Sequence, residues 1–415
     1  MRGKATGFNN VAGMYQQWGK YEQALEYFQK ALQIDEETKD IKGKAIRLNN
    51  IGSVYEQWGK YEQALEYFQK ALQIAQERKD IRRKATMLNN IGSVYQQWGK
   101  YEQALEYFLK ALQITEELKY IREKAARLNN IASVYQQWGK YEQALEYFLK
   151  ALEIDEELKD IKGKGARLNN IASVYQDQGK HEKALEYLQK ALQVAEELKD
   201  FRGKTIYLTN IATVYQDGGK YEEALEYFLK ALEIDEERKD IRGKATRLNN
   251  IGIVYQQWGK YEKALEYFQK ALEIDEETKD IKGKATRLNN IAIVYQQWGK
   301  YEKALEYFLR ALEIAEELKD IKGKATRLNN IASMYKQWGK YEQALEYFQK
   351  ALQMDEELMD IRGKATRLNN IAIVYQDEGR PGKALEYFQQ SLKLFEELKD
   401  AQNIAVIKKN IKNLT

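Results

Sequence analysis

The chain has 415 residues, and its 67 basic and 63 acidic side chains leave a formal net charge of +4, too little to attract nucleic acid or a membrane strongly. It contains no cysteine and one histidine, which excludes disulfides, thiolate metal sites and multi-histidine metal sites. A single proline beside 44% hydrophobic residues indicates an almost wholly helical chain. No apolar run approaches the roughly 20 residues that cross a bilayer. The start of the chain lacks the apolar core of a signal peptide, so we expect a cytoplasmic protein.

The sequence aligns with itself in consecutive segments of 40 residues, without insertion or deletion. We number these segments as repeats 1 to 10: 1–40, 41–80, 81–120, 121–160, 161–200, 201–240, 241–280, 281–320, 321–360 and 361–400. A constant period of this length is typical of a solenoid, in which each unit contacts only its neighbours.

Each repeat predicts two helices, as repeat 7 illustrates. The first helix spans 241–258, because Leu248, Ile251 and Tyr255 recur on one helical face. Asp240 is its expected N-cap, and Gly259 interrupts the pattern. A second helix is expected over 261–279, with an apolar face made by Ala264, Leu265, Phe268, Ala271 and Leu272.

The two ends of the array differ. After repeat 10, residues 401–415 carry an apolar stripe of Ile404, Ile407, Ile411 and Leu414, which predicts a C-terminal capping helix. Repeat 1 begins directly at a first helix without such a cap. Either a further segment precedes it, or this end associates with a partner or with another copy as a homo-oligomer.

The repeats carry a recurring spacing: Leu-x2-Ile-Gly/Ala-x2-Tyr, then Gly and Tyr, then Ala-x3-Phe-x2-Ala. This pattern resembles the tetratricopeptide repeat over 400 of the 415 residues. The family's usual proline near the end of the second helix is replaced, by Glu276 in repeat 7, and the repeat is roughly six residues longer than the common form. Long repeats of this kind resemble the kinesin light chain class and related bacterial arrays. The resemblance implies an all-α, right-handed α-solenoid superhelix of ten helix-turn-helix repeats whose first helices line a concave wall.

One arc of each first helix remains outside the apolar face. In repeat 7 it carries Thr246, Asn249, Asn250, Ile253, Gln256 and Gln257. The equivalent of Asn250 is Asn in all ten repeats, and the preceding residue is Asn in nine, with Thr209 as the exception. Asn is a mediocre helix former, so this repetition needs a reason.

A carboxamide both donates and accepts hydrogen bonds, so it can match the N–H and C=O groups of an extended peptide. The resemblance implies the same role, because the second Asn holds peptide backbones in kinesin-light-chain-like arrays. An alternative is that these side chains bond between adjacent repeats and only fix their stacking, and the two roles are compatible. The predicted peptide-binding residues are Asn90, Asn130, Asn170, Asn210, Asn249, Asn250, Ile253, Asn289, Asn290, Ile293, Asn330 and Asn370.

The residue three places after the second Asn varies along the chain. It is Ser in most early repeats but becomes Ile253, Ile293 and Ile373 later. We therefore expect apolar pockets over repeats 6 to 8, although drift between duplicated segments explains the change equally well. Seven repeats end their first helix in Trp, a position that favours packing over the inter-helix turn and alternatively offers a partner surface. His181 is expected to replace a packing Tyr in that turn.

Several patterns that resemble chemical sites favour plain structure instead. The acidic run Asp275, Glu276 and Glu277 lacks the glycine-containing turn of a calcium loop and predicts a solvated face. The Lys162-Gly163-Lys164 segment lacks the spacing of a phosphate loop. No nucleophile, base and orienting residue recur together, so we expect no enzyme, cofactor or metal. Helical repeats that recognise RNA are a competing class, but the near-neutral charge argues against nucleic acid.

The sequence thus predicts a non-enzymatic scaffold that binds an extended peptide or disordered segment along a concave, Asn-lined groove. Two alternatives stay open. One is a structural or self-assembly element that associates through the uncapped N-terminal end. The other is the sensing arm of a larger signalling or effector protein.

Overall fold

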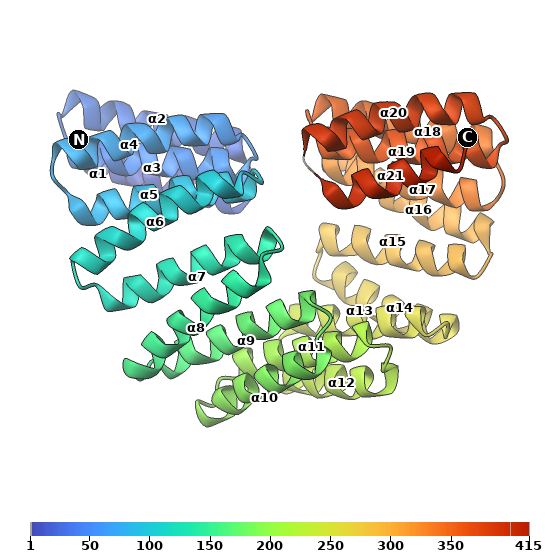
Figure 1. Ribbon diagram of the computed structural model, residues 1–415, viewed down its shortest axis with the longest axis horizontal. Helices are drawn as coiled ribbons and strands as arrows, with labels where there is room; N and C mark the ends of the chain where they lie inside the picture. The colour runs from blue at the N-terminus through green and yellow to red at the C-terminus, as the bar shows by residue number, and fades with distance from the viewer. Residues whose placement is uncertain (1, 399, 415) are drawn as a thin grey trace. The chain divides into compact units, whose positions relative to one another are not determined.

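The computed structural model describes residues 2–398 and 400–414, which form 21 α-helices and no strand (Figure 1). The first helices of the repeats are α1 (Arg2–Gln17), α3 (Ile41–Gln57), α5 (Ile81–Gln97), α7 (Ile121–Gln137), α9 (Ile161–Asp177), α11 (Phe201–Asp217), α13 (Ile241–Gln257), α15 (Ile281–Gln297), α17 (Ile321–Gln337) and α19 (Ile361–Asp377).

The second helices are α2 (Tyr21–Glu37), α4 (Tyr61–Glu77), α6 (Tyr101–Glu117), α8 (Tyr141–Glu157), α10 (His181–Glu197), α12 (Tyr221–Glu237), α14 (Tyr261–Glu277), α16 (Tyr301–Glu317), α18 (Tyr341–Glu357) and α20 (Pro381–Glu397). A last helix, α21 (Ala401–Lys412), follows. Among the residues described, none of these helices combines the length and the apolar character that crossing a bilayer would need.

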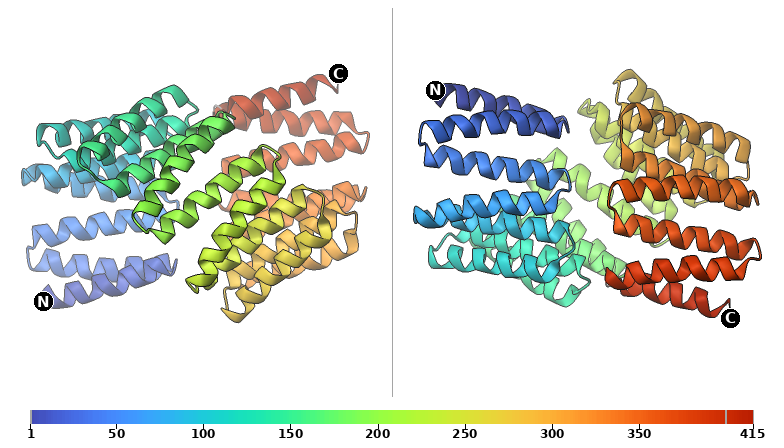
Figure 2. Two further views of the ribbon diagram at one scale, coloured as in Figure 1. Left: turned by 90° about the horizontal axis from the view of Figure 1, so that it is seen from below. Right: turned by 90° about the horizontal axis from the view of Figure 1, so that it is seen from above.

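The chain divides into two compact units, residues 1–214 and residues 215–415. Within each unit the two helices of a repeat pack as a pair, and the second helix packs against the first helix of the next repeat, so the helices follow one another in layers (Figure 2). In the second unit, for example, α13 packs on α14, α14 packs on α15, and α13 also contacts α15 directly. This succession of helix pairs is the predicted solenoid packing.

Local signals in the sequence set the helix ends. The side chain of Asp240 accepts a hydrogen bond from the backbone N–H of Gly243 at 2.9 Å, so the expected N-cap of α13 is confirmed. Gly259 ends the first helix with φ +74, a left-handed conformation that glycine adopts without a steric penalty. Second helices end the same way on a non-glycine residue, since Lys279 has φ +56. Both predicted helices of repeat 7 end within two residues of the bounds found.

The core of each repeat lies between its two helices and the next first helix. Leu248, Ile251 and Val254 of α13 are buried. Phe268 of α14 is fully buried against Gly252 of α13, and it belongs to one core cluster with Leu288, Ile291 and Val294 of α15. Gly252 permits this contact, because a Cβ atom at this position would lie 2.8 Å from the Phe268 ring. The apolar faces of the helices are therefore buried in these cores. The polar arc of each first helix lies outside the cores, and we call the surface formed by these arcs the wall.

Candidate functional site

The paired asparagines form hydrogen bonds between neighbouring repeats. Asn290 Nδ2 donates to Asn249 Oδ1 at 2.8 Å, so the second Asn of repeat 8 bonds to the first Asn of repeat 7. The same bond, at 2.6–3.1 Å, joins seven further pairs, which together form what we call the asparagine ladder: Asn50–Asn9, Asn90–Asn49, Asn130–Asn89, Asn170–Asn129, Asn210–Asn169, Asn330–Asn289 and Asn370–Asn329. The stacking role that the sequence left open is therefore present in the structure.

The two asparagines differ in exposure in repeats 7 and 8. Asn249 and Asn289 are 8% exposed, so the first Asn of these two repeats lies deeper than its place on the predicted open arc suggests. Asn250 and Asn290 are half-buried. A primary carboxamide has two N–H donors and two acceptor positions on its oxygen. A second Asn that donates one N–H within the ladder therefore keeps hydrogen-bonding capacity for a ligand.

The ladder is interrupted at Asn250. Thr209 occupies the first-Asn position of repeat 6, and its hydroxyl donates to the backbone carbonyl of Thr205 at 2.7 Å. Within the described residues, the Asn250 side chain makes no hydrogen bond. Asn250 is thus a half-buried carboxamide whose donor and acceptor groups are both unpaired.

Four arginines donate hydrogen bonds to asparagines of the ladder. Arg47, Arg127, Arg167 and Arg367 each donate a hydrogen bond to a first Asn, at 2.9–3.1 Å. These side chains enter the junction between two repeats, where most also meet a buried aspartate from the preceding second helix. Where such an aspartate is present, a single guanidinium group therefore contacts both an asparagine of the wall and that buried aspartate.

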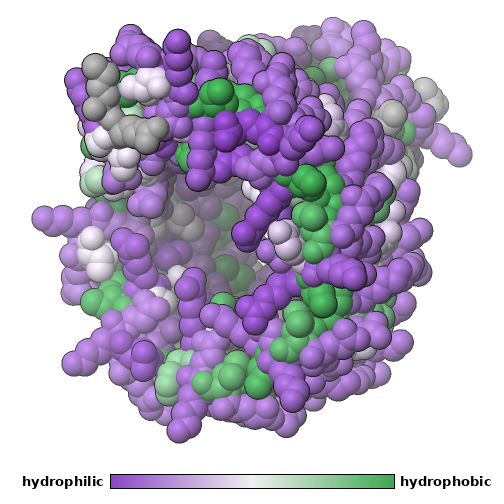
Figure 3. Space-filling view, turned by 90° about the vertical axis from the view of Figure 1, so that its left-hand side faces the viewer, coloured by the Kyte–Doolittle hydropathy of each residue, from purple (hydrophilic) through white to green (hydrophobic). Residues whose placement is uncertain are grey.

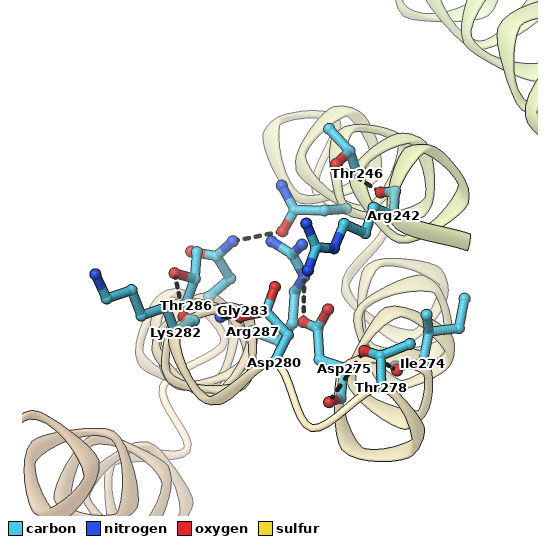
Figure 4. Close-up of polar contacts among 12 residues, drawn as sticks. Arg242, Thr246, Ile274, Asp275, Thr278, Asp280, Lys282, Gly283, Thr286 and Arg287 are labelled. Atoms are coloured by element: carbon cyan, nitrogen blue, oxygen red, sulfur yellow. Dashed lines mark hydrogen bonds and ion pairs between the residues drawn. The ribbon is translucent and has the colours of Figure 1, made fainter. Parts of the chain in front are cut away.

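The buried aspartates are the polar residues that the sequence analysis missed. Asp275 belongs to the acidic run expected to be solvated, yet it is 4% exposed while Glu276 and Glu277 are exposed. Its Oδ2 lies 3.2 Å from Arg287 Nε, and Figure 4 shows the carboxylate pointing toward that guanidinium. Burial raises the pKa of Asp275, and the charge of Arg287 opposes this rise. Burial also lowers the pKa of Arg287.

A glycine accompanies each of these aspartates. A Cβ atom on Gly283 would lie 2.7 Å from the carboxyl carbon of Asp275, so only glycine fits there (Figure 4). Asp, Gly and Arg occur together at five junctions, which we call the junction triads: Asp35–Gly43–Arg47, Asp155–Gly163–Arg167, Asp235–Gly243–Arg247, Asp275–Gly283–Arg287 and Asp355–Gly363–Arg367. This co-occurrence across the repeat boundary was the signal that could have found them.

In the second unit, the part of the wall that follows the asparagines along each first helix carries isoleucine and glutamine side chains. Ile253 and Ile293 are half-buried and pack against the local cores while part of each side chain stays exposed. Gln256 Nε2 donates to Gln297 Oε1 at 3.2 Å, and Gln296 Nε2 donates to Gln337 Oε1 at 2.8 Å. A groove of about 450 Å³ lies along these glutamines. This wall therefore combines uncharged hydrogen-bonding groups with isoleucine side chains.

In the first unit, the equivalent positions carry different side chains. Ser93 Oγ donates to Glu56 Oε1 at 2.8 Å, and Gln97 Nε2 donates to the same oxygen at 2.9 Å. Burial raises the pKa of Glu56, and the hydrogen bond from Ser93 opposes the rise. The side chains at these positions of the wall thus differ between the two units.

A space-filling view shows mainly hydrophilic residues interrupted by short rows of hydrophobic ones (Figure 3).

The tryptophans pack at the turns, as expected. The Trp298 ring lies 6.0 Å from Tyr261 and 6.5 Å from Tyr295 between ring centroids, and Lys300 Nζ lies 3.0 Å from its centroid. Trp18 differs, because it is 60% exposed.

Within the described residues, no three or more His, Cys, Asp or Glu side chains gather where they could hold a metal ion.

Comparison with known proteins identifies the repeat. The family model described as "Tetratricopeptide repeat" matches residues 4–77, 83–157, 166–237, 204–277, 283–357 and 324–397. No curated protein matches the sequence.

Solved structures show the fold alone, because their sequence identities are low. A signal transduction ATPase with numerous domains and a tetratricopeptide repeat sensor, from Pyrococcus horikoshii, is 19% identical with a TM-score of 0.50, over 89% of this chain and 55% of that protein. A putative kinesin light chain of Podosopora anserina with nearly identical TPR-like repeats is 17% identical with a TM-score of 0.42, over 48% of this chain and 99% of that one. A Rap protein complexed with Competence and Sporulation Factor is 18% identical with a TM-score of 0.47, over 87% and 99% of the two chains.

Proposed function

Because the chain belongs to the tetratricopeptide repeat family, we propose that it is a protein-interaction scaffold that binds an extended peptide or disordered segment along the Asn-bearing wall. The observation that carries the proposal is Asn250, a half-buried carboxamide without a partner beside the half-exposed Ile253 on the same helix. A peptide backbone would satisfy both hydrogen-bonding groups of Asn250, and an apolar peptide side chain would cover Ile253.

The spacing of the wall supports an extended ligand. First helices of neighbouring repeats lie close enough for direct hydrogen bonds, such as that between Asn249 and Asn290. Packed helices are separated by about 9–10 Å, and three residues of extended chain or one turn of polyproline II helix cover about 9–10 Å. A ligand could therefore meet one second Asn for every three of its residues.

The experiment is a selection from a random-peptide display library on the parent, followed by binding measurements on single variants. We expect Asn250→Ala to weaken the selected peptides by about tenfold, since a charge-neutral hydrogen-bonding site would be lost from a buried contact. Asn10→Ala is the matched control, because Asn10 is a second Asn that, like Asn250, makes no side-chain hydrogen bond within the described residues, and it is not among the predicted peptide-binding residues.

Ile253→Ser tests the apolar pocket with the residue that most early repeats carry at this position. It should change which peptides are selected while leaving helicity unchanged. If Asn250→Ala and the triple variant of Asn210, Asn250 and Asn290 to Ala bind the selected peptides as tightly as the parent does, the ladder is structural only and the proposal is wrong.

A second candidate function, self-association, has its own observation. On α1 the side chains of Val11 and Met14 are 36% and 51% exposed, whereas their equivalents on α3, Ile51 and Val54, are fully buried by the preceding repeat. Trp18, which follows α1, is 60% exposed. A second copy could cover this face. Light scattering should then give a mass above that of a monomer, and Met14→Lys should restore the monomer. A monomeric parent at high concentration would remove this candidate.

A further inference from the structure

The junction between repeats 2 and 3 lacks the triad found at five other junctions. Ala75 replaces the aspartate, Arg83 replaces the glycine, and Met87 replaces the arginine. These changes belong together sterically, because a triad aspartate leaves no room for a Cβ atom at the glycine position, whereas the small Ala75 does. This junction therefore carries its arginine at the glycine position of the triad, as Arg83, and lacks the buried aspartate that pairs with the arginine at the other five junctions.

A cavity of about 160 Å³ lies at this junction. Its charged lining consists of Lys42 from the first turn of α3, Arg78 from the end of α4, and Asp80 and Arg83 at the start of α5. The rest of the lining is Ala45, Ile74 and Ala75. Its volume corresponds to about five water molecules at 30 Å³ each, enough for a tetrahedral oxyanion with some water.

The charge of the lining is positive. Three cationic side chains against one carboxylate give a net charge of +2 for the cavity. Asp80 is already engaged, because it accepts a hydrogen bond from the Arg83 backbone N–H at 3.0 Å and its Oδ2 lies 3.3 Å from Arg83 Nε. At the junction of repeats 7 and 8, the equivalent charged residues are Arg242, Asp275, Asp280 and Arg287, which sum to zero. The excess positive charge is thus specific to repeats 2 and 3 in this comparison.

The cavity continues onto the wall. A second groove of about 350 Å³ shares Ala45, Asp80 and Arg83 with it and extends to Ile46, Asn49 and Met87. Arg82 also borders this groove, but it pairs with Glu123 at 3.4 Å. Asn49 belongs to the asparagine ladder, where its Oδ1 accepts from Asn90. A group in the cavity can therefore be attached to a chain that lies along the wall of the first unit.

We propose that this junction is a binding subsite for a phosphoryl group, with Arg83, Arg78 and Lys42 as its ligands. A phosphate monoester carries a charge of about −1.5 to −2 near neutral pH, which matches the lining better than a single carboxylate does. Guanidinium groups bind its oxygens through charge-assisted hydrogen bonds. A phosphorylated side chain of an extended peptide is the source that fits the adjoining groove, and that source, unlike the subsite itself, rests on the proposed function.

The first test uses inorganic phosphate as the probe, measured by calorimetric titration at constant ionic strength. The variant Ala75→Asp, Arg83→Gly, Met87→Arg gives this junction the triad that five other junctions already accommodate, so we expect it to fold. It should bind phosphate at least about tenfold more weakly than the parent, because the charge-assisted hydrogen bonds from Arg83 are removed and the new aspartate places a second carboxylate at the cavity. Arg83→Gln should show a similar loss and stands in if the triple variant fails to fold.

A reciprocal variant moves the site. Asp275→Ala, Thr278→Arg, Gly283→Arg and Arg287→Met reproduce the repeat 2–3 junction at repeats 7 and 8, where Arg242 already supplies the equivalent of Lys42. We expect a second phosphate site per chain. The proposal is overturned if the triple variant and Arg83→Gln both bind phosphate as the parent does, or if acetate competes as well as phosphate.

The second test identifies the source of the phosphoryl group. Matched peptide libraries with serine or phosphoserine at a fixed position are selected on the parent and on the triple variant. Enrichment of phosphopeptides on the parent alone supports a phosphorylated partner. Equal enrichment of both libraries, with phosphate binding intact, supports a free phosphate compound as the ligand. Asn250→Ala should leave phosphate binding unchanged, so failure of the wall proposal and failure of this one are distinguishable.

Discussion

Gly283 and Asp275 approach each other so closely that a single methyl group on the glycine would lie 2.7 Å from the aspartate carboxyl carbon. The two residues come from different repeats, and Arg287 closes the contact with an Nε to Oδ2 distance of 3.2 Å. The identity of a residue at the end of one repeat therefore restricts the start of the next. The repeats are alike in sequence but are not freely interchangeable.

This contact predicts a strong pairwise effect on stability. Gly283→Ala should lower the free energy of unfolding by about 1–3 kcal/mol, because the added Cβ overpacks a buried carboxylate. In the double variant with Asp275→Ala, the clash with the Asp275 carboxyl group is absent, as at the junction of repeats 2 and 3, where Ala75 accompanies Arg83. A double-mutant cycle followed by urea unfolding should give a coupling of about 1 kcal/mol or more. Additive effects would show that the two side chains do not interact.

The buried aspartates predict an unusual pH dependence. Burial raises the pKa of Asp275 in the folded state, so the folded protein holds this proton more tightly than the unfolded chain does. Its contribution to stability is then full below the unfolded pKa of about 3.9 and is lost as the pH rises through the higher folded pKa. The stability of the parent relative to Asp275→Asn should fall over that window. A difference that is flat or increases with pH would contradict the raised pKa.

The interrupted ladder predicts unequal costs for equivalent substitutions. Asn290→Ala removes the donor to Asn249, whose buried oxygen then lacks this partner, and should cost about 1–2 kcal/mol of stability. Asn250→Ala removes no hydrogen bond within the described residues and should stay within about 0.5 kcal/mol of the parent. Urea unfolding of both variants measures the difference. Equal losses would mean that the asparagines stabilise the helices without pairing.

The tryptophans predict a similar contrast. Trp298→Gln removes the ring contacts with Tyr261 and Tyr295 and the contact with Lys300, and should cost about 1–3 kcal/mol. Trp18→Gln removes a mostly exposed ring and should cost about 0.5 kcal/mol or less. Repeat 5 carries Gln178 at this position, so the substitution introduces no foreign residue. Thermal unfolding followed by circular dichroism tests both variants, and a larger loss for Trp18→Gln would be inconsistent with turn packing.

Much of the fold could be predicted from one repeat. The spacing of Leu248, Ile251 and Tyr255 fixed a helical face, and Asp240 and Gly259 marked the ends of the helix that contains them. The family and its helix pairs followed from the same local signals. These features depend on residues that are near one another in sequence, where helical geometry relates position to direction directly.

The site was less accessible to such reasoning. A helical projection gives the direction of Asn249, but not that Asn290, 41 residues away, comes within 2.8 Å of it. Asp275 sits in an acidic run that any single repeat would present to solvent, and its burial depends on Gly283 of the next repeat. Contacts of this kind depend on how two repeats pack together, so they appear only when residues are compared across a boundary.

The coupling between Asp and Gly also restricts how such an array can shorten. Loss of residues 281–320 would join Asp275 to Gly323 and Arg327, and a complete triad would form at the new boundary. Loss of residues 41–80 would instead place Asp35 opposite Arg83, where a Cβ atom has no room. Recombination between near-identical segments would thus produce viable chains for some excisions and defective chains for others. The number of repeats is consequently limited by which boundaries can meet.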